Sequence, residues 1–278
     1  KDEHQFELQQ IDLRWRNTCN FACVYCGSLF SSVWAKFEGQ PDKMQNDAMK
    51  TTFSFVIKNI KNLKTIYMAG GEPFLIKENL KIIELIKKEN PDILLRINTN
   101  LSVLPTKIYQ QIKSLKNVHW IVSAESTNER FNYIRWPGKY SLLLENLKKI
   151  QKLNHKVTIN MTWNILCSFN ILDFIDNMLE NGIHPNQFVM NYVSDPLYYS
   201  ISNLTQNLRQ KLISKIQDRK KHVDKKFYLS KVYNEMENLL NEPLINHRKE
   251  LYNDLMQIDK QRKLNCKDIF PELNEVLL

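Results

Sequence analysis

Short apolar or alternating runs occur six times in the first two thirds of the chain, and most are followed by apolar residues at helical spacing. The runs predict strands at 6–15, 65–69, 94–99, 118–124, 156–165 and 188–193. The helical spacing predicts helices at 43–62, 76–89, from Pro105, at 141–153 and at 171–181, with an irregular connection at 31–42. Because crossovers between parallel strands are right-handed, this order predicts an α/β fold, a partial (β/α)6 TIM-like barrel.

The pattern changes after residue 193. Helical periodicity without strands runs over 205–262. In the tail FPELNEVLL, the residues Phe270, Leu273 and Leu277 share one helical face, so we expect the tail to dock on the body of the protein. The chain therefore divides into a partial-barrel core over 1–193 and a C-terminal helical cap or appendage over 194–278.

Composition limits the classes of protein that the chain can belong to. Hydrophobic residues make up 43% of the 278 residues, which is enough for a substantial core and excludes a disordered chain. No apolar run reaches the ~20 residues that cross a bilayer, so no membrane partner is expected. The net charge of +9 allows a nucleic-acid partner, but the lysines fall mostly on polar helix faces, which favours a solvated surface.

Three of the five cysteines, Cys19, Cys23 and Cys26, form a CxxxCxxC motif on the loop after the first predicted strand. Clustered thiolates are soft ligands that suit zinc or an iron-sulfur cluster. A structural zinc site takes four ligands, whereas a [4Fe-4S] cluster held by three cysteines keeps one iron open. Cys167 and Cys266 stand alone, so the motif offers no local fourth ligand. Because thiolates require a reducing compartment, we predict a cytoplasmic protein.

Two further details accompany the cysteines. An aromatic residue, Tyr25, stands directly before the third cysteine, and the sequence Gly70-Gly71-Glu72-Pro73 follows the second predicted strand. Together with CxxxCxxC, these details resemble the radical SAM (S-adenosylmethionine) superfamily. The resemblance implies a [4Fe-4S] cluster on the three cysteines and SAM on its open iron. It also implies that Tyr25 packs near the adenine and that the GGEP segment binds the methionyl amino group.

Polar residues gather at the carboxyl ends of the predicted strands, where the loops of a parallel α/β sheet converge. The resemblance implies that some of them bind the carboxylate and ribose of SAM, and that Arg135 in YIRWPGKY binds the methionyl carboxylate. A surface salt bridge is the alternative for Arg135, and a backbone partner is the alternative for an asparagine within a strand. The other candidates are Asn98, Asn100, Ser123, Glu125 and Asn160.

The runs SSVW, YIRWPGKY and FPEL resemble the twitch or SPASM-related subgroup of the superfamily. That likeness implies a 5′-deoxyadenosyl radical that abstracts hydrogen from a peptide or protein side chain, with an electron donor such as flavodoxin or ferredoxin. The alternative within the superfamily is a nucleotide, sugar, RNA base or other small metabolite. A zinc-stabilised nucleic-acid-binding module is the alternative from another class. Cys167 and Cys266 are too few for the auxiliary cluster that many members of the subgroup carry.

Overall fold

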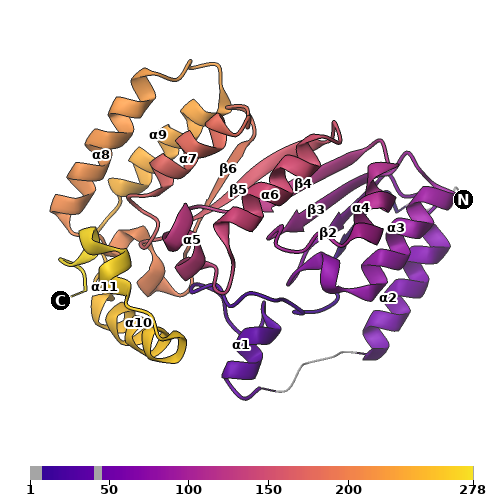
Figure 1. Cartoon of the computed structure of the whole chain (residues 1–278), viewed down its shortest axis with the longest axis horizontal. Coiled ribbons are helices and arrows are strands. Elements are labelled where there is room, and N and C mark those ends of the chain that lie inside the picture. Colours follow the sequence, from indigo (N-terminus) through magenta and orange to yellow (C-terminus); the bar gives the residue numbers. More distant parts are fainter. Residues whose placement is uncertain (1–7, 41–45, 278) are drawn as a thin grey trace, which may run out of the picture. The chain divides into compact units, whose positions relative to one another are not determined.

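The computed structural model describes residues 8–40 and 46–277 of the chain (Figure 1). The chain forms two compact units, each built from separated segments. The first takes residues up to 22, 26–122 and 142–157, and the second takes 23–25, 123–141 and 158–278. The boundary between residues 193 and 194 stays a prediction, because these units follow packing and are not contiguous in sequence.

The strands confirm the predicted α/β class. They belong to one sheet whose spatial order follows the chain order, as expected of a partial (β/α)6 barrel. The pairs resolved within the two units are parallel. The strands are β1 (Gln10–Leu13), β2 (Thr65–Met68), β3 (Leu94–Thr99), β4 (Val118–Ser123), β5 (Lys156–Trp163) and β6 (Phe188–Tyr192).

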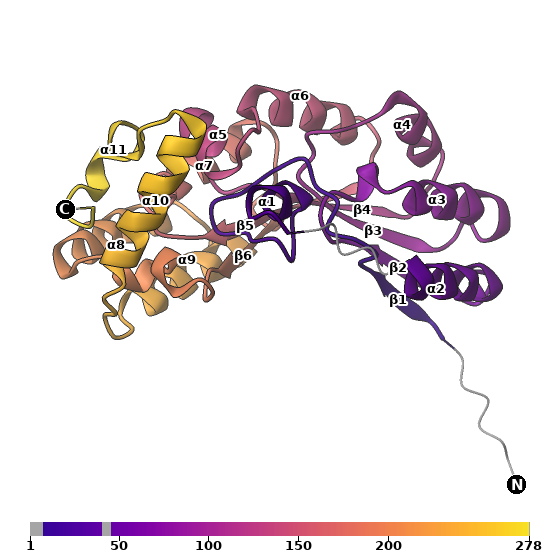
Figure 2. The same cartoon turned by 90° about the horizontal axis from the view of Figure 1, so that it is seen from below.

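In the first unit, helices lie along one face of β1 to β4 (Figures 1 and 2). Alternate strand residues are buried toward them, such as Ile66, Met68 and Ile97, each fully buried. The residues between them, such as Tyr67 and Arg96, are partly exposed. This half of the sheet thus has an apolar face and a polar face. The helices assigned wholly or mainly to this unit are α1 (Ser32–Phe37), α2 (Asn46–Asn59), α3 (Lys77–Glu89), α4 (Thr106–Lys113) and α6 (Tyr140–Gln151), with the 3-10 turn η1 (Pro73–Leu75).

The second unit joins most of β5 and all of β6 to the C-terminal helices. On β5, Val157, Ile159, Met161 and Trp163 are all buried, and Thr158 is buried between the first two of them. Its helices are α5 (Asn128–Ile134), α7 (Ile171–Glu180), α8 (Gln206–Lys221), α9 (Tyr228–Leu240), α10 (Arg248–Arg262) and α11 (Cys266–Ile269), and its 3-10 turns are η2 (Leu197–Tyr199), η3 (Ile201–Asn203) and η4 (Pro271–Leu273). The helical C-terminal region is therefore confirmed.

The predicted docking of the tail is also confirmed. Phe270, Leu273 and Leu277 are fully buried, and Phe270 packs edge-on against Tyr133 of α5 at a ring-centroid distance of 5.3 Å. No helix in the described part of the chain combines the length and apolar character needed to cross a bilayer.

Two helices differ from the prediction. The segment 31–42 contains α1, whose N-cap Ser31 accepts hydrogen bonds from the backbone N–H groups of Val33 and Trp34. Helix α5 lies where no element was predicted, because seven residues are too few to show a helical period. The first strand is shorter than predicted, at Gln10–Leu13, and the predicted start of the second helix falls at 43–45, outside the described residues.

Candidate functional site

The loop that carries the cysteine motif is anchored to the start of α1. The Ser32 hydroxyl accepts a hydrogen bond from the backbone N–H of Cys19 at 3.1 Å and donates one to the carbonyl of the same residue at 3.1 Å. The buried Ser31 hydroxyl donates to the Phe21 carbonyl at 2.5 Å. The helix that follows the motif therefore fixes the backbone around its first cysteine.

The GGEP segment packs directly against the residue that precedes Cys19. Gly71 has a φ of +53°, and a Cβ on it would lie 2.1 Å from the Thr18 carbonyl oxygen. The backbone N–H of Glu72 donates to that same oxygen at 2.8 Å. Only a residue without a side chain allows this approach, which explains the second glycine of the motif.

The end of β3 holds the residue that follows Cys19. The Asn100 side chain donates to the Asn20 side-chain oxygen at 3.0 Å, and Asn20 donates to the Ser102 hydroxyl at 2.8 Å. The first cysteine thus stands between two residues held by the ends of β2 and β3. A cavity of about 300 Å³ lies next to the two glycines of the GGEP segment, lined also by 14–17 and 28–30, among others.

Glu72 points into the first unit and is fully buried. Its carboxylate accepts from the Thr99 hydroxyl at 2.8 Å, from the Asn100 N–H at 2.8 Å and from the Phe74 N–H at 3.3 Å. Burial raises the pKa of Glu72 to about 7, although the three donors act in the opposite direction. The side chain therefore ties the turn after β2 to the end of β3, a role that the motif alone did not predict. Its contact with the amino group of SAM stays a prediction.

Replacement of Glu72 by glutamine is expected to change how stability depends on pH. Between pH 4.5 and about 7 the folded chain keeps the Glu72 proton and the unfolded chain has released it. The free energy of unfolding of the wild type should therefore fall across this window, by roughly 3 kcal/mol relative to Glu72→Gln. Urea unfolding of both proteins at several pH values measures the difference, and parallel profiles would contradict the assignment.

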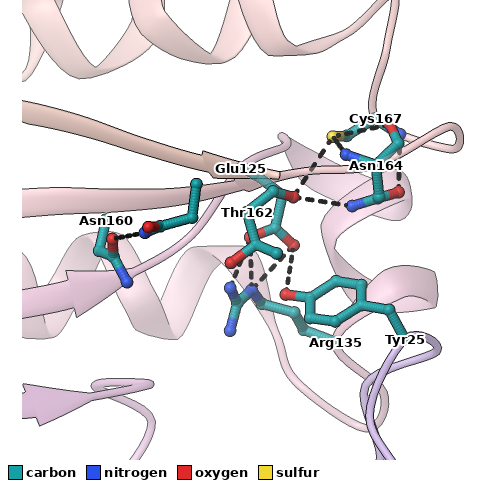
Figure 3. Close-up of polar contacts among 8 residues, drawn as sticks. Tyr25, Glu125, Arg135, Asn160, Thr162, Asn164 and Cys167 are labelled. Atoms are coloured by element: carbon teal, nitrogen blue, oxygen red, sulfur yellow. Dashed lines mark hydrogen bonds and ion pairs between the residues drawn. The ribbon is translucent and has the colours of Figure 1, made fainter. Parts of the chain in front are cut away.

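In the second unit, Tyr25, Glu125 and Arg135 meet (Figure 3). The Arg135 Nε donates to both carboxylate oxygens of Glu125 at 3.0 Å, and its Nη2 lies 2.5 Å from Oε2. The Tyr25 hydroxyl donates to Glu125 Oε1 at 3.2 Å. The side chains of Arg135 and Glu125 are 6% and 0% exposed, so the surface salt bridge considered for Arg135 is instead a buried one. The Arg135 guanidinium, which was expected to bind the methionyl carboxylate of SAM, is bonded to the Glu125 carboxylate instead.

Replacement of Arg135 by glutamine is expected to cost about 3–5 kcal/mol of stability, because it leaves the Glu125 carboxylate buried without its cation. Arg130→Gln is a matched control, since Arg130 forms a similar pair with Glu272 whose side chains are 24% and 21% exposed. The control should cost less than half as much, and the double variant Glu125→Gln/Arg135→Gln should recover most of the loss. Denaturant unfolding measures the loss of stability of each variant. Equal losses for Arg135→Gln and Arg130→Gln would refute the prediction.

The remaining candidates are more scattered. The side chain of Asn160, on β5, accepts a hydrogen bond from the Asn191 side chain at 2.6 Å (Figure 3). Asn98 and Ser123 lie partly exposed on β3 and at the end of β4, and Pro73 is the buried first residue of η1. Cys167 is fully buried, and burial raises the pKa of its thiol well above the ordinary value.

Sequence reasoning missed Thr99 among the candidates. Its hydroxyl reaches both carboxylate oxygens of Glu72, at 2.8 and 3.0 Å, across 27 positions of the sequence. The position of Thr99 at the end of a predicted strand, between two asparagines that were selected, was the available signal.

None of the five cysteines forms a disulfide, and Cys19 and Cys26 are partly exposed while Cys23 is buried. Cys23 belongs to the second unit and the other two cysteines of the motif belong to the first. Within the described residues, no three His, Cys, Asp or Glu side chains are grouped as a site for a single metal ion. Three thiols with no fourth protein ligand in the motif are the donor set that suits a cluster with an open iron.

Comparison with known proteins identifies the family. Residues 15–164, more than half of the chain, match the family model described as "Radical SAM superfamily". A GTP 3′,8-cyclase of Clostridium perfringens is 30% identical over 195 residues, which cover 66% of this chain and 55% of that protein. A GTP 3′,8-cyclase of Campylobacter lari is 27% identical over 172 residues, covering 62% of this chain and 47% of the relative. The chain thus spans about half the length of these curated relatives.

Solved structures agree on the fold. Native anSMEcpe with bound AdoMet has a TM-score of 0.56 and 16% sequence identity, and the match covers 90% of this chain and 66% of that one. SuiB of Streptococcus suis, bound to S-adenosylmethionine, has a TM-score of 0.54 and 15% identity, covering 78% of this chain and 48% of its own. The chain therefore belongs to the radical SAM superfamily, and it is an enzyme that uses S-adenosylmethionine and a [4Fe-4S] cluster.

Proposed function

We propose that this enzyme uses the radical derived from SAM to abstract hydrogen from a nucleotide. The support is the names of the curated relatives, since all four that match are GTP 3′,8-cyclases or a probable one. Because the chain spans about half of those proteins, the proposal covers hydrogen abstraction from a nucleotide and does not include formation of the cyclic product.

The peptide or protein side chain that the subgroup resemblance implied has weaker support. None of the matching curated relatives is named for a peptide substrate, and the solved structures, at about 16% identity, speak for the fold alone. The resemblance to the twitch or SPASM-related subgroup rests on short sequence runs alone. The nucleotide, first considered as an alternative, is therefore the better-supported substrate.

In this proposal Cys19, Cys23 and Cys26 hold the cluster. When bound and reduced, the cluster would supply the electron that splits SAM. The glycines of the GGEP segment give the methionyl amino group access to backbone oxygens beside the first cysteine. Tyr25 packs against the adenine with its ring held by the hydrogen bond to Glu125. The other residues proposed to surround SAM are Glu72, Pro73, Asn98, Asn100, Ser123, Glu125, Arg135 and Asn160.

The proposal is tested with anaerobically reconstituted protein, SAM and dithionite, in the presence of GTP deuterated on its ribose. We expect 5′-deoxyadenosine to form faster with GTP than without it, and deuterium to appear in the 5′-deoxyadenosine. ATP and a mixture of peptides serve as comparison substrates. Deuterium transfer from labelled peptides and none from either nucleotide would refute the nucleotide and restore the peptide. Replacing dithionite with reduced flavodoxin or ferredoxin tests the proposed electron donor. The cytoplasmic location stays a prediction.

A further inference from the structure

A row of polar side chains crosses the first unit on the face of the sheet opposite its helices. The strand register places Asp12 beside Tyr67, Tyr67 beside Arg96, and Arg96 beside His119. Tyr67, Arg96 and His119 each stand between two buried apolar residues, and Asp12 precedes the buried Leu13, so the four side chains share one face. Four strands thus contribute one ionisable or aromatic residue each to a single line, in which Asp12 is exposed and the other three are partly exposed.

Tyr67 lies between two guanidinium groups. The Arg96 Cζ is 5.2 Å from the centroid of the Tyr67 ring, and the Arg14 Cζ is 5.6 Å from it. Both distances are within the range of a cation–π contact, which orients a guanidinium without occupying its N–H donors. The aromatic ring therefore positions both arginines without using the N–H donors of Arg96.

Only one of the two arginines is paired with a carboxylate. Asp12 binds Arg14 through three hydrogen bonds of 3.1 to 3.2 Å, so Arg14 is neutralised. Arg96 has no carboxylate partner among the described residues, and its buried Nε has no hydrogen-bond partner there either. Burial, together with Lys156 and Arg96, lowers the pKa of His119 to about 4, so that ring is neutral at pH 7. The uncompensated positive charge of the row is that of Arg96, with Lys156 nearby.

A buried N–H donor without an acceptor carries a desolvation cost that a ligand can relieve. The planar fork of arginine matches the oxygens of a phosphate or carboxylate, and the Tyr67 hydroxyl can add a further hydrogen bond. Arg96 stands three residues before Thr99, which places it on the order of 10 Å along β3 from the edge where the GGEP segment meets the cysteine loop. The row is therefore set back from the region proposed for SAM.

We propose that Arg96, oriented by Tyr67 and flanked by His119, is a binding subsite for the phosphate groups of the substrate. The subsite deepens the proposed function, since it would hold the charged end of a nucleotide while the rest of the molecule extends toward the edge of the sheet. An anionic group on SAM is the other source of the same chemistry, and the experiment separates the two.

The experiment measures equilibrium binding of GTP, guanosine, inorganic tripolyphosphate and SAM to the anaerobically reconstituted protein. The variants are Arg96→Gln, which removes the charge, and Arg96→Lys, which keeps it without the fork. Arg219→Gln is the control, because Arg219 is a partly exposed arginine of the second unit that pairs with Asp176 at 2.7 Å. Iron content and the circular dichroism spectrum show whether each variant is folded.

We expect the wild type and Arg219→Gln to bind GTP more tightly than guanosine. Arg96→Gln should weaken the binding of GTP about 10- to 100-fold and leave the binding of guanosine and SAM unchanged. The affinity of Arg96→Lys for GTP should fall between those of the wild type and Arg96→Gln. Should Arg96→Gln weaken SAM and spare GTP, the subsite would belong to SAM and the proposal would be wrong. If GTP binding is tight and indifferent to Arg96, the subsite fails while the nucleotide proposal stands.

If the wild type binds neither nucleotide, the proposed function fails, and tripolyphosphate then tests the subsite alone. Binding of tripolyphosphate that depends on Arg96 would support an anion subsite for another phosphorylated substrate. Binding that is absent, or unaffected by Arg96→Gln, would overturn it.

Discussion

Replacement of Cys23 by alanine is expected to abolish formation of 5′-deoxyadenosine from SAM under dithionite. The motif provides three thiols, and all of them are needed to hold a cluster that leaves one iron open. Because Cys167 and Cys266 lie outside the motif, we expect neither to replace the missing ligand. Iron and sulfide content should fall with the activity, and the anaerobically purified protein should lose its brown colour.

Cys167→Ala is the matched control for this result. Cys167 is also a buried thiol, it lies outside the motif, and its sulfur contacts the backbone around Asn164 (Figure 3). This variant should keep its iron, its colour and its rate of SAM cleavage, with at most a modest loss of stability. Full activity of Cys23→Ala, or loss of iron in both variants alike, would contradict the assignment of the motif as the cluster ligands.

Replacement of Gly71 by alanine is expected to remove most of the bound iron without altering any ligand. The added Cβ would meet the Thr18 carbonyl oxygen at 2.1 Å and the Thr18 carbonyl carbon at 2.7 Å, both of them backbone atoms next to Cys19. The φ of +53° adds strain for any residue with a side chain. The turn and the cysteine loop therefore have to separate, which displaces the first cluster ligand.

Gly27→Ala is the control, because Gly27 lies directly after Cys26 and an added Cβ there has no neighbour within 4 Å. Gly70→Ala should be intermediate, since its Cβ would lie 3.2 Å from the Arg16 carbonyl oxygen at a φ of +80°. Iron content after anaerobic reconstitution, measured for the three variants, gives the order expected: Gly27→Ala highest, then Gly70→Ala, then Gly71→Ala. Equal iron in Gly27→Ala and Gly71→Ala would show that the close approach has no role in holding the cluster.

Most strands were predictable from sequence because each is a short apolar run between polar segments. The third strand was predicted at its observed bounds, Leu94–Thr99, and the helix after Pro105 begins at Thr106. The two helices that were missed, α1 and α5, are six and seven residues long. Elements of two turns or fewer are held by caps and tertiary contacts, so their sequences carry little periodic signal.

The sequence by itself determined the family and predicts the cluster ligands, because the motif of Cys19, Cys23 and Cys26 depends only on residue type and close spacing along the chain. Only the tertiary structure decided how the other polar residues are engaged. In the folded chain Arg135 forms an ion pair with Glu125, and the buried Glu72 accepts a hydrogen bond from Thr99. Arg96 packs on the Tyr67 ring and has no carboxylate partner among the described residues. Pairs such as Glu72 and Thr99 are distant in sequence and meet only when neighbouring strands align, so no local pattern encodes which charges are neutralised and which remain available.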